Sequence, residues 1–341
     1  MKKVIIIYDV PWGKCDKKWL YEKSVERGLK TIRISPRKTL YDIEIKNKIF
    51  YLYVMCICFF MSLKAVLIAR PGDVIVGWKT ISGMFASILS SKKVQVISLN
   101  WLTPQPNDKL RFLKNITINK ENTWIGVNCE NTKKQLVEEY KLQNSDRIFW
   151  IPDIPAEDYA FEELIEKNER YCFTGGINNR DWNLILNVAK KNRDIEFQCV
   201  AVEKYYKENV NNLVNLNNLK LHFDLERSKY YSILKNAYIM VLPLKDNRVA
   251  GLINVIKSIE LGILPLTSKN EAIEQYYPQN LRTILQFEVG NVDELSEKIH
   301  LLYSLSYDEY KKYLEELREY LRMNFNADVA ISCIINKMES N

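Results

Sequence analysis

Residues 171–182, YCFTGGINNRDW, combine the residue types that bind phosphate groups. A buried strand over Tyr171–Thr174 is followed by Gly175 and Gly176, which let the backbone turn sharply and approach a ligand closely. The helix that begins near Trp182 would direct its free N–H groups into the same space, where Arg180 adds a planar charged fork. Asn178 and Asp181 are expected to cap the helix, and Asn179 is expected to contact the ligand. The pattern predicts an anion site; an arginine in an ordinary surface ion pair is the alternative.

A second glycine-containing turn lies within Val241–Thr267. A buried strand ends at Pro243, a polar loop follows, and the next helix begins near Leu252. Its N-terminal amides would present another anion site at the ends of neighbouring strands. An ordinary helix between two strands is the alternative. The residues expected at this site are Lys245, Ala250, Gly251, Leu252, Asn254 and, on a later turn, Glu260.

Short apolar runs alternate with helical patterns along both halves of the chain, as in doubly wound α/β domains. The expected strands are Val4–Tyr8, Lys30–Ile34, Asp73–Gly77, Val94–Leu99, Ile125–Asn128, Arg147–Ile151, Tyr171–Thr174, Phe197–Val202, Leu219–Phe223, Tyr238–Leu242 and Ile263–Leu266. The expected helices are Lys17–Arg27, Ser82–Leu89, Thr132–Tyr140, Trp182–Lys190, Ser228–Asn236, Leu252–Leu261, Val292–Leu305 and Tyr307–Phe325. The acidic segment Glu157–Glu169 has a helical pattern and is interpreted as the linker.

The chain of 341 residues is long for one compact domain and comfortable for two. The net charge of +7 is spread along the chain, and no basic run with interleaved aromatic residues suggests nucleic-acid binding. Seven cysteines at irregular spacings indicate free thiols in a reducing compartment rather than a disulfide framework or a zinc site. The first residues lack the long apolar run and cleavage site of a signal peptide, so a cytoplasmic protein is expected.

The apolar stretch Ile49–Leu63, IFYLYVMCICFFMSL, permits three interpretations. The first is a membrane-spanning helix, although the stretch is shorter than the roughly 20 residues that such a helix requires. A buried crossover helix is one alternative. A helix lying on the membrane surface is another, because cations flank the aromatic face at Lys46, Lys48, Lys64 and Arg70.

The order of these features resembles the GT-B glycosyltransferases, and in particular the bacterial family 4 enzymes that build capsular and lipid-linked polysaccharides. The resemblance covers nearly the whole chain and is most specific in the second half. The segments that carry it are Val127–Asn131 with Arg147–Ile154, the run GGINNRDW, the tripeptide AGL at 250–252 and the run ELGILPL at 260–266.

The resemblance implies two Rossmann-like domains facing an interdomain cleft. The acceptor-binding domain is expected over residues 1–156, the nucleotide-sugar-binding domain over 157–322, and a C-terminal helix over 323–341 packing back toward the first domain. It implies that Arg180 reaches the diphosphate of the sugar donor, that Ala250–Leu252 opens the donor-binding helix, and that the loop beside His222 holds the nucleotide base. A core-edge histidine is the alternative for His222.

One departure from the family concerns its two glutamates, which stand eight positions apart around this helix. Counted back from Gly262, those positions hold Val249 and Lys257 here. The ribose and sugar contacts of the family motif therefore do not carry over to this chain. Either Asn254 and Glu260 replace the glutamates, or the sugar donor is held differently.

In the first half, residues 9–14, DVPWGK, resemble the acceptor-side loop of these enzymes, with Trp12 and Gly13 facing the sugar donor. A general base there must be a carboxylate, since neither histidine lies in this half, and Asp9 or Asp16 is the choice. Asp9 as a simple turn residue is the alternative. No Asp-x-Asp motif occurs, so backbone amides, Arg180 and Lys245 are expected to hold the diphosphate without a metal.

The sequence thus predicts a metal-independent, hexosyltransferase-type glycosyltransferase without a cofactor. It would move a sugar from a nucleoside-diphosphate sugar to a lipid-linked or glycan acceptor in bacterial surface polysaccharide synthesis. It would be cytoplasmic and would contact the inner face of the membrane through the Ile49–Leu63 region. Two alternatives stay open: a catalytically inactive GT-B-like partner subunit, which the missing glutamate pair suggests, and a sugar-nucleotide epimerase of the same fold.

Overall fold

The computed structural model describes residues 2–9, 18–36, 48–102, 108–143, 145–154, 159–166, 170–177, 179–210, 216–248 and 250–339, with the backbone alone at 48–51. Several residues singled out in the sequence lie outside these ranges: Trp12, Gly13, Asp16, Lys46, Asn178 and Val249. The chain divides into two compact units, Met1–Asp158 with Phe325–Asn341, and Tyr159–Asn324.

Unit 1, Met1–Asp158 with Phe325–Asn341, is built on a parallel six-stranded sheet in the order β2-β1-β3-β4-β5-β6. Its strands are β1 (Lys3–Ile7), β2 (Lys30–Ile34), β3 (Val74–Gly77), β4 (Gln95–Trp101), β5 (Thr123–Val127) and β6 (Ile148–Trp150). The central strands β3 and β4 are almost wholly buried because helices cover both faces of the sheet. All of β3 is buried, for example.

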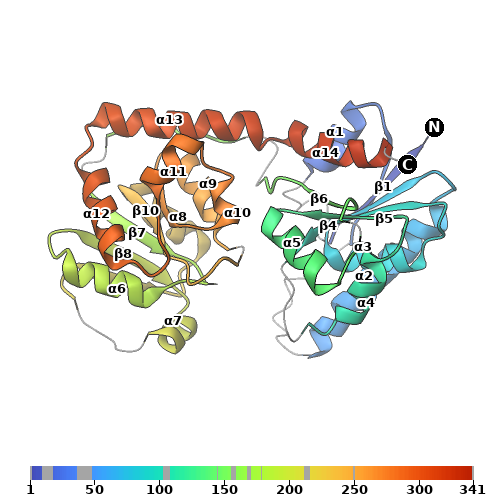
Figure 1. Cartoon of the computed structure of the whole chain (residues 1–341), viewed down its shortest axis with the longest axis horizontal. Helices are drawn as coiled ribbons and strands as arrows, with labels where there is room; N and C mark the ends of the chain where they lie inside the picture. Colours follow the sequence, from blue (N-terminus) through green and yellow to red (C-terminus); the bar gives the residue numbers. More distant parts are fainter. Residues whose placement is uncertain are drawn as a thin grey trace. The chain divides into compact units, whose positions relative to one another are not determined.

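The helices that the structure describes in unit 1 are α1 (Trp19–Glu26), α2 (Lys48–Ile68), α3 (Thr80–Leu89), α4 (Arg111–Ile118), α5 (Glu130–Glu139) and α14 (Ala327–Glu339). The last of these lies beside α1 (Figure 1), where Arg27 pairs with Asp328 at 3.1 Å. Its far end reaches the sheet, because Gln95 Nε2 donates to the carbonyl of Lys337 at 2.5 Å. The C-terminal helix therefore closes one face of unit 1.

A buried carboxylate fastens the starts of two strands in unit 1. Asp73 accepts from the backbone N–H groups of Lys3 at 2.9 Å and Arg70 at 2.8 Å, and it pairs with the Lys3 ammonium at 3.2 Å. Burial alone would raise the pKa of Asp73, but these hydrogen bonds and charges outweigh it and lower the pKa. Asp73 thus joins β1 to β3 in its charged form.

Unit 2, Tyr159–Asn324, contains a second parallel six-stranded sheet, in the order β12-β11-β10-β7-β8-β9. The strands are β7 (Tyr171–Gly175), β8 (Glu196–Ala201), β9 (Leu219–Phe223), β10 (Ile239–Leu242), β11 (Leu264–Ser268) and β12 (Gln286–Phe287). The helices are α6 (Trp182–Lys191), α7 (Glu203–Asn209), α8 (Arg227–Asn236), α9 (Leu252–Glu260), α10 (Glu271–Glu274), α11 (Gln279–Leu285), α12 (Val292–Tyr303) and α13 (Tyr307–Asn324).

The expectation of two doubly wound α/β domains is confirmed, and each strand predicted from the sequence is present to within two residues at either end. The helical interpretation of Glu157–Glu169 is wrong for its described part, residues 159–166, which form no helix. There the backbone N–H of Glu162 donates to the carbonyl of Glu260 at 2.8 Å, and the guanidinium of Arg322 lies 4.6 Å from the Phe161 ring centroid. Contacts with the body of unit 2 thus replace the hydrogen bonds that a helix would supply.

Helix α2 spans 21 residues and extends beyond the apolar stretch noted in the sequence. One face packs on the sheet through Val54, Cys58, Met61 and Ala65, as a crossover helix does. The opposite face is exposed, and its side chains include Leu52, Phe60 and Leu67. Within the described ranges, none of the helices combines the length and the apolar character needed to cross a membrane.

Candidate functional site

The order of the strands in unit 2 places a topological switch point at the carboxyl ends of β7 and β10. The connection from β7 leads to β8 on one side, whereas β10 pairs with β7 on the other. Connections that leave in opposite directions open a gap outside the strand ends, and ligands of open α/β sheets bind there. Gly175 ends β7 and Leu242 ends β10, so the two turns singled out in the sequence meet at this gap.

The glycine loop after β7 has the conformation that its residues predict. Gly176 has φ of 126°, which only glycine adopts readily. Asp181 caps α6, because its Oδ1 accepts from the backbone N–H of Leu184 at 3.0 Å. Between them the chain runs antiparallel to the segment after β10, where the N–H of Asp181 donates to the carbonyl of Pro243 at 3.0 Å.

Arg180 folds back over the end of β7. Its Nε donates to the carbonyl of Gly175 at 2.9 Å, and only 4% of the residue is exposed. A Cβ added at Gly176 would lie 2.5 Å from a terminal nitrogen of the guanidinium, and one added at Gly251 would lie 3.0 Å from it. The guanidinium therefore occupies space that only two glycines leave open. Burial lowers the pKa of Arg180 to about 10, which still keeps it charged at neutral pH.

Helix α9 begins at the same place. Its N-cap is Gly251, in the left-handed conformation with φ of 82°; glycine has no side chain to cap the free N–H groups, and within the described ranges no capping hydrogen bond is made there. Asn254, in the first turn, donates from Nδ2 to the carbonyl of Gly175 at 3.2 Å. The guanidinium of Arg180 and the positive end of the helix dipole are thus close together and repel each other. An anion bound between them would relieve that repulsion and satisfy the helix amides.

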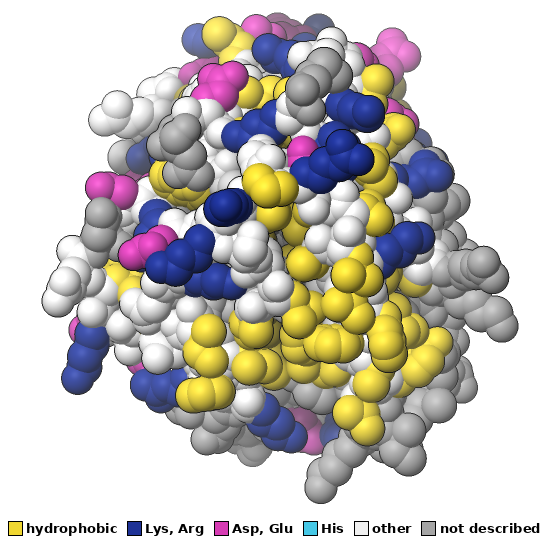
Figure 2. Space-filling model, turned by 90° about the vertical axis from the view of Figure 1, so that its right-hand side faces the viewer, with side chains coloured by type: hydrophobic (Ala, Val, Ile, Leu, Met, Phe, Trp, Pro, Cys, Tyr) yellow, Lys and Arg dark blue, Asp and Glu magenta, His cyan; other side chains and the backbone are white. Residues whose placement is uncertain are grey.

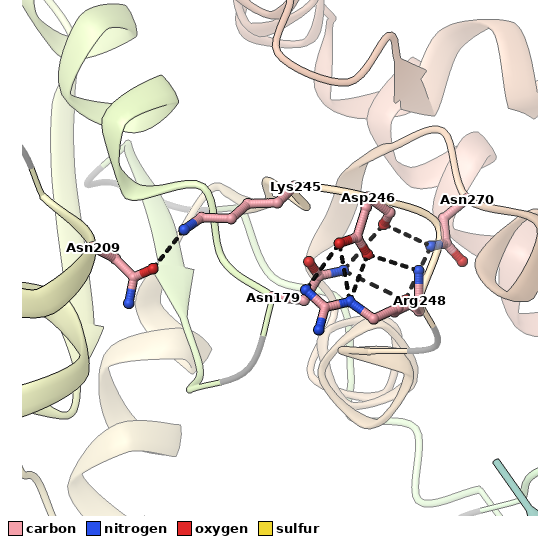
Figure 3. Close-up of polar contacts among 6 residues, drawn as sticks. All are labelled: Asn179, Asn209, Lys245, Asp246, Arg248 and Asn270. Atoms are coloured by element: carbon pink, nitrogen blue, oxygen red, sulfur yellow. Dashed lines mark hydrogen bonds and ion pairs between the residues drawn. The ribbon is translucent and has the colours of Figure 1, made fainter. Parts of the chain in front are cut away.

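The polar loop between β10 and α9 is fixed by hydrogen bonds (Figure 3). The carbonyl of Asp246 accepts from Asn179 Nδ2 at 3.0 Å and from Asn270 Nδ2 at 3.4 Å. Arg248 holds the Asp246 carboxylate through Nε at 2.9 Å and a terminal nitrogen at 2.9 Å, and this contact lowers the pKa of Asp246. Asn179, expected as a ligand contact, instead positions this loop.

Lys245 lies on the same loop, but its ammonium points to α7, where it donates to Asn209 Oδ1 at 2.5 Å (Figure 3). The remaining expected residues of this turn, Ala250 and Leu252, flank Gly251, and the Leu252 side chain is buried. The structure therefore brings Arg180, Asn254 and the glycines together and directs the Lys245 side chain elsewhere.

Glu260 and His222 do not join this cluster. Glu260 lies at the opposite end of the nine-residue helix α9, about 13 Å from its start, and pairs with Lys257 at 2.9 Å. His222 lies on the edge strand β9, separated from β7 by β8, and its Nε2 is 3.2 Å from Gln198 Oε1. Partial burial and the charge of Lys220 lower the pKa of His222.

Sequence reasoning missed Tyr230, which reaches the cluster from α8. A Cβ added at Gly175 would lie 2.5 Å from its hydroxyl oxygen. Its ring packs edge-on against Phe173, with the centroids 5.2 Å apart, and burial raises the pKa of Tyr230. The expected helix over Ser228–Asn236 contained this residue, but a single tyrosine in a helical pattern gives no sign of the direction in which it points.

In unit 1 the corresponding gap lies between β1 and β3, whose connections leave in opposite directions. Asp9 follows β1 there, is 2% exposed, and has one carboxylate oxygen 3.7 Å from the Lys79 ammonium. Asn100 has a positive φ of 57° at the next strand end and donates from Nδ2 to the carbonyl of Trp78 at 2.6 Å. Unit 1 thus also presents polar side chains at the carboxyl edge of its sheet.

Among the side chains that the structure describes, no group of three or more His, Cys, Asp and Glu residues is arranged to hold a metal ion. Metal independence therefore stays a prediction. The polar cluster at the end of β7 consists of hydrogen-bond donors and one cation, a set of groups that suits an anion rather than a metal.

Comparisons with known proteins give structural relatives only. No protein-family model and no curated protein sequence matches the chain. A glycosyltransferase structure from Rickettsia africae matches with a TM-score of 0.66 at 15% identity, covering 99% of this chain and 98% of the other. An alpha,alpha-trehalose 6-phosphate synthase from Burkholderia multivorans matches with a TM-score of 0.67 at 9% identity, covering 100% and 97%.

An E. coli trehalose-6-phosphate structure bound with UDP-2-fluoro glucose matches with a TM-score of 0.68 at 9% identity, covering 100% of this chain and 99% of the other. These identities are low, so the likeness concerns the fold. With its two parallel six-stranded α/β sheets, the chain has the fold of the GT-B glycosyltransferases.

Proposed function

We propose that the protein is a glycosyltransferase whose unit 2 holds a nucleoside-diphosphate sugar without the aid of a metal. The observation that carries the proposal is the buried guanidinium of Arg180, placed between Gly176 and Gly251 at the start of α9. A diphosphate bridging Arg180 and the helix amides would neutralise both positive groups. The fold adds support, since a structure of similar fold is bound with a UDP sugar.

The same groups would stabilise the leaving group. Transfer breaks the bond between the anomeric carbon of the sugar and the diphosphate oxygen, and the bonding electrons remain on the diphosphate. The charge that develops there would meet the guanidinium of Arg180 and the free N–H groups at the start of α9. Fixed hydrogen-bond donors of this kind contribute about 2–4 kcal/mol each to transition-state stabilisation.

The test compares the wild-type protein with Arg180→Ala, Arg180→Lys and, as a matched control, Arg193→Ala, which changes an exposed arginine after α6. A thermal-shift panel of UDP, GDP, CMP and dTDP sugars identifies the nucleotide, and release of the nucleotide product measures turnover. We expect both Arg180 variants to lose about a hundredfold or more in turnover and the control to lose nothing. An Arg180→Ala protein with unchanged turnover would refute the proposed role of Arg180 in holding the diphosphate.

We further propose that the acceptor binds unit 1 and that Asp9 is the general base. Its carboxylate is buried at the end of β1, with one oxygen 3.7 Å from the Lys79 ammonium, and a carboxylate is a group that can take a proton from an acceptor hydroxyl. Asp9→Asn keeps the size of the side chain and removes its basicity. We expect it to abolish transfer while the affinity for the nucleotide sugar stays the same; transfer at the wild-type rate would exclude Asp9 as the base.

We also propose that the acceptor is lipid-linked, as in surface polysaccharide synthesis, and that the exposed face of α2 contacts the cytoplasmic side of the membrane. Leu52 is 63% exposed, Phe60 64% and Leu67 75%, and all three lie on the same side of the helix. The exposed cations Lys64 and Arg70 accompany them, and residues 48–72 contain no Asp or Glu. Figure 2 shows apolar side chains gathered on one face, with cations around them.

Vesicle co-sedimentation tests this surface, with phosphatidylglycerol-containing vesicles beside neutral phosphatidylcholine ones. The variants are Phe60→Ser and Leu67→Ser, and the matched control is Met323→Ser on α13, where the methionine is 65% exposed. Each α2 variant is expected to weaken binding about tenfold, because a buried large apolar side chain contributes about 1.5–3 kcal/mol. Equal vesicle binding by all the variants contradicts the proposal. A dimer in analytical sedimentation that the α2 variants disrupt also contradicts it, because the exposed face of α2 would then be covered by a second copy of the chain.

A further inference from the structure

The hydroxyl of Tyr230 is a buried polar group that the contacts of the folded chain leave unused. Among the residues that the structure describes, this oxygen has no partner at hydrogen-bond geometry; the Asn254 side chain is close enough to lower the pKa of Tyr230, which is the effect of a donor to the oxygen and leaves the hydroxyl hydrogen unused. It lies at the end of β7, where the Arg180 and Asn254 side chains also converge. A buried hydroxyl without a partner is costly, because it has left water and gained no hydrogen bond in return.

The carbonyl of Gly175, at the same strand end, is already occupied. Arg180 Nε donates to this oxygen at 2.9 Å and Asn254 Nδ2 donates to it at 3.2 Å. A backbone carbonyl offers two lone pairs, so no acceptor capacity remains there for the hydroxyl of Tyr230. The hydrogen of that hydroxyl is therefore available to a ligand.

The position of Tyr230 is fixed by its surroundings. Its ring packs edge-on against Phe173, with the centroids 5.2 Å apart, and against Tyr231 at 5.4 Å. Gly175 must be glycine for the hydroxyl to sit where it does, because an added Cβ would lie 2.5 Å from the oxygen. A side chain held this firmly keeps its hydroxyl in place before any ligand arrives, so little conformational entropy is lost on binding.

We propose that Tyr230 is a direct ligand-binding residue, whose hydroxyl donates a hydrogen bond to a diphosphate oxygen held by Arg180. The proposal rests on the proposed function of this site and adds a neutral donor to its charged one. Neighbouring positive charge supports it: the Arg180 guanidinium is close enough to stabilise negative charge at the Tyr230 position. A phosphate oxygen within reach of Arg180 would thus accept a hydrogen bond from the Tyr230 hydroxyl.

Tyr230→Phe removes only the hydroxyl, and the expected signature has two parts. The unliganded protein should melt at the wild-type temperature or slightly above it, because a hydroxyl without a partner no longer has to be buried. Affinity for inorganic diphosphate, measured by titration calorimetry, should fall about ten- to a hundredfold, the loss typical of a hydrogen bond to a charged group. A purely structural role for Tyr230 predicts a lower melting temperature and unchanged affinity.

The matched control is Tyr171→Phe, since the hydroxyl of Tyr171 on β7 donates to the carbonyl of Ile233 on α8 at 2.6 Å. This variant should lower the melting temperature and leave diphosphate affinity unchanged. Gly175→Ala, which pushes the Tyr230 hydroxyl aside, should weaken diphosphate binding as Tyr230→Phe does.

Arg180→Ala separates the two proposals. If Arg180→Ala loses diphosphate binding and Tyr230→Phe keeps it, the role of Tyr230 is refuted and the proposed function stands. If neither variant changes the affinity, or the wild-type protein does not bind diphosphate, both proposals fail.

Discussion

Replacing Gly251 with alanine would test whether the space at the start of α9 is reserved for Arg180. Gly251 has φ of 82°, and a Cβ added there would lie 2.7 Å from Leu242 Cδ2 and 3.0 Å from the Arg180 guanidinium. Leu242 is fully buried, so its methyl groups have little room to move. Gly290 provides the matched control in the same unit: its φ is 76°, but nothing lies within 4 Å of an added Cβ.

The two substitutions share one cost and differ in another. A left-handed alanine costs about 1–2 kcal/mol at either position. Overpacking against a buried side chain adds about 1–3 kcal/mol, and only Gly251→Ala incurs it. We therefore expect Gly251→Ala to lower the free energy of unfolding by about 2–5 kcal/mol and Gly290→Ala by about 1–2 kcal/mol.

Urea unfolding of unit 2, followed by the same spectroscopic signal for both variants, measures the difference, and calorimetry with inorganic diphosphate measures the functional consequence. Gly251→Ala should also bind diphosphate more weakly, because its methyl group displaces the guanidinium from the start of the helix. Gly290→Ala should bind normally. Equal stability and equal affinity of the two variants would refute the geometry described for Arg180.

Three further predictions concern carboxylates. Asp73→Asn should lower the free energy of unfolding by about 2–3 kcal/mol at pH 7. Since folding lowers the pKa of Asp73, the difference in unfolding free energy between wild type and variant should be complete above pH about 4 and should vanish as the pH falls through the folded-state pKa. Urea unfolding at pH values from 2 to 7 would measure it. Glu260→Gln should lower the melting temperature, because it breaks a half-buried ion pair with Lys257, and should leave the affinity for diphosphate unchanged. Weaker diphosphate binding by this variant would show that Glu260 contributes to the binding site. Asp246→Asn should change stability by less than about 1 kcal/mol in urea unfolding, because its pair with Arg248 is exposed.

The sheets could be predicted from the sequence because a strand of a parallel sheet is buried on both faces. Runs such as Val74–Gly77 and Ile239–Leu242 are therefore apolar throughout and stand out from the amphipathic helices around them. The glycine turn after β7 could also be predicted, since Gly176 has a conformation that other residues avoid and aspartate, here Asp181, is a common N-cap residue.

Side-chain direction could not be read in the same way. Lys245 and Glu260 were chosen because their charges lie near the second turn in sequence, yet Lys245 points to α7 and Glu260 sits at the far end of α9. Tyr230 was overlooked because its place depends on how α8 packs against Phe173, a contact between elements more than fifty residues apart. Segment 159–166 was wrongly predicted as helical, because its contacts with the body of unit 2, among them the backbone hydrogen bond from Glu162 to Glu260, cannot be seen in a local pattern.

The membership of α14 in unit 1 has a consequence for synthesis of the protein. A ribosome that has reached Asn324 has made all of unit 2, whereas unit 1 still lacks α14, the helix that lies beside α1. Ile331 and Ile334 of α14 are fully buried, so their neighbours stay uncovered until the last residues emerge. Although unit 1 is begun first, it is completed last, and a nascent chain must keep that apolar face from aggregating throughout translation of unit 2.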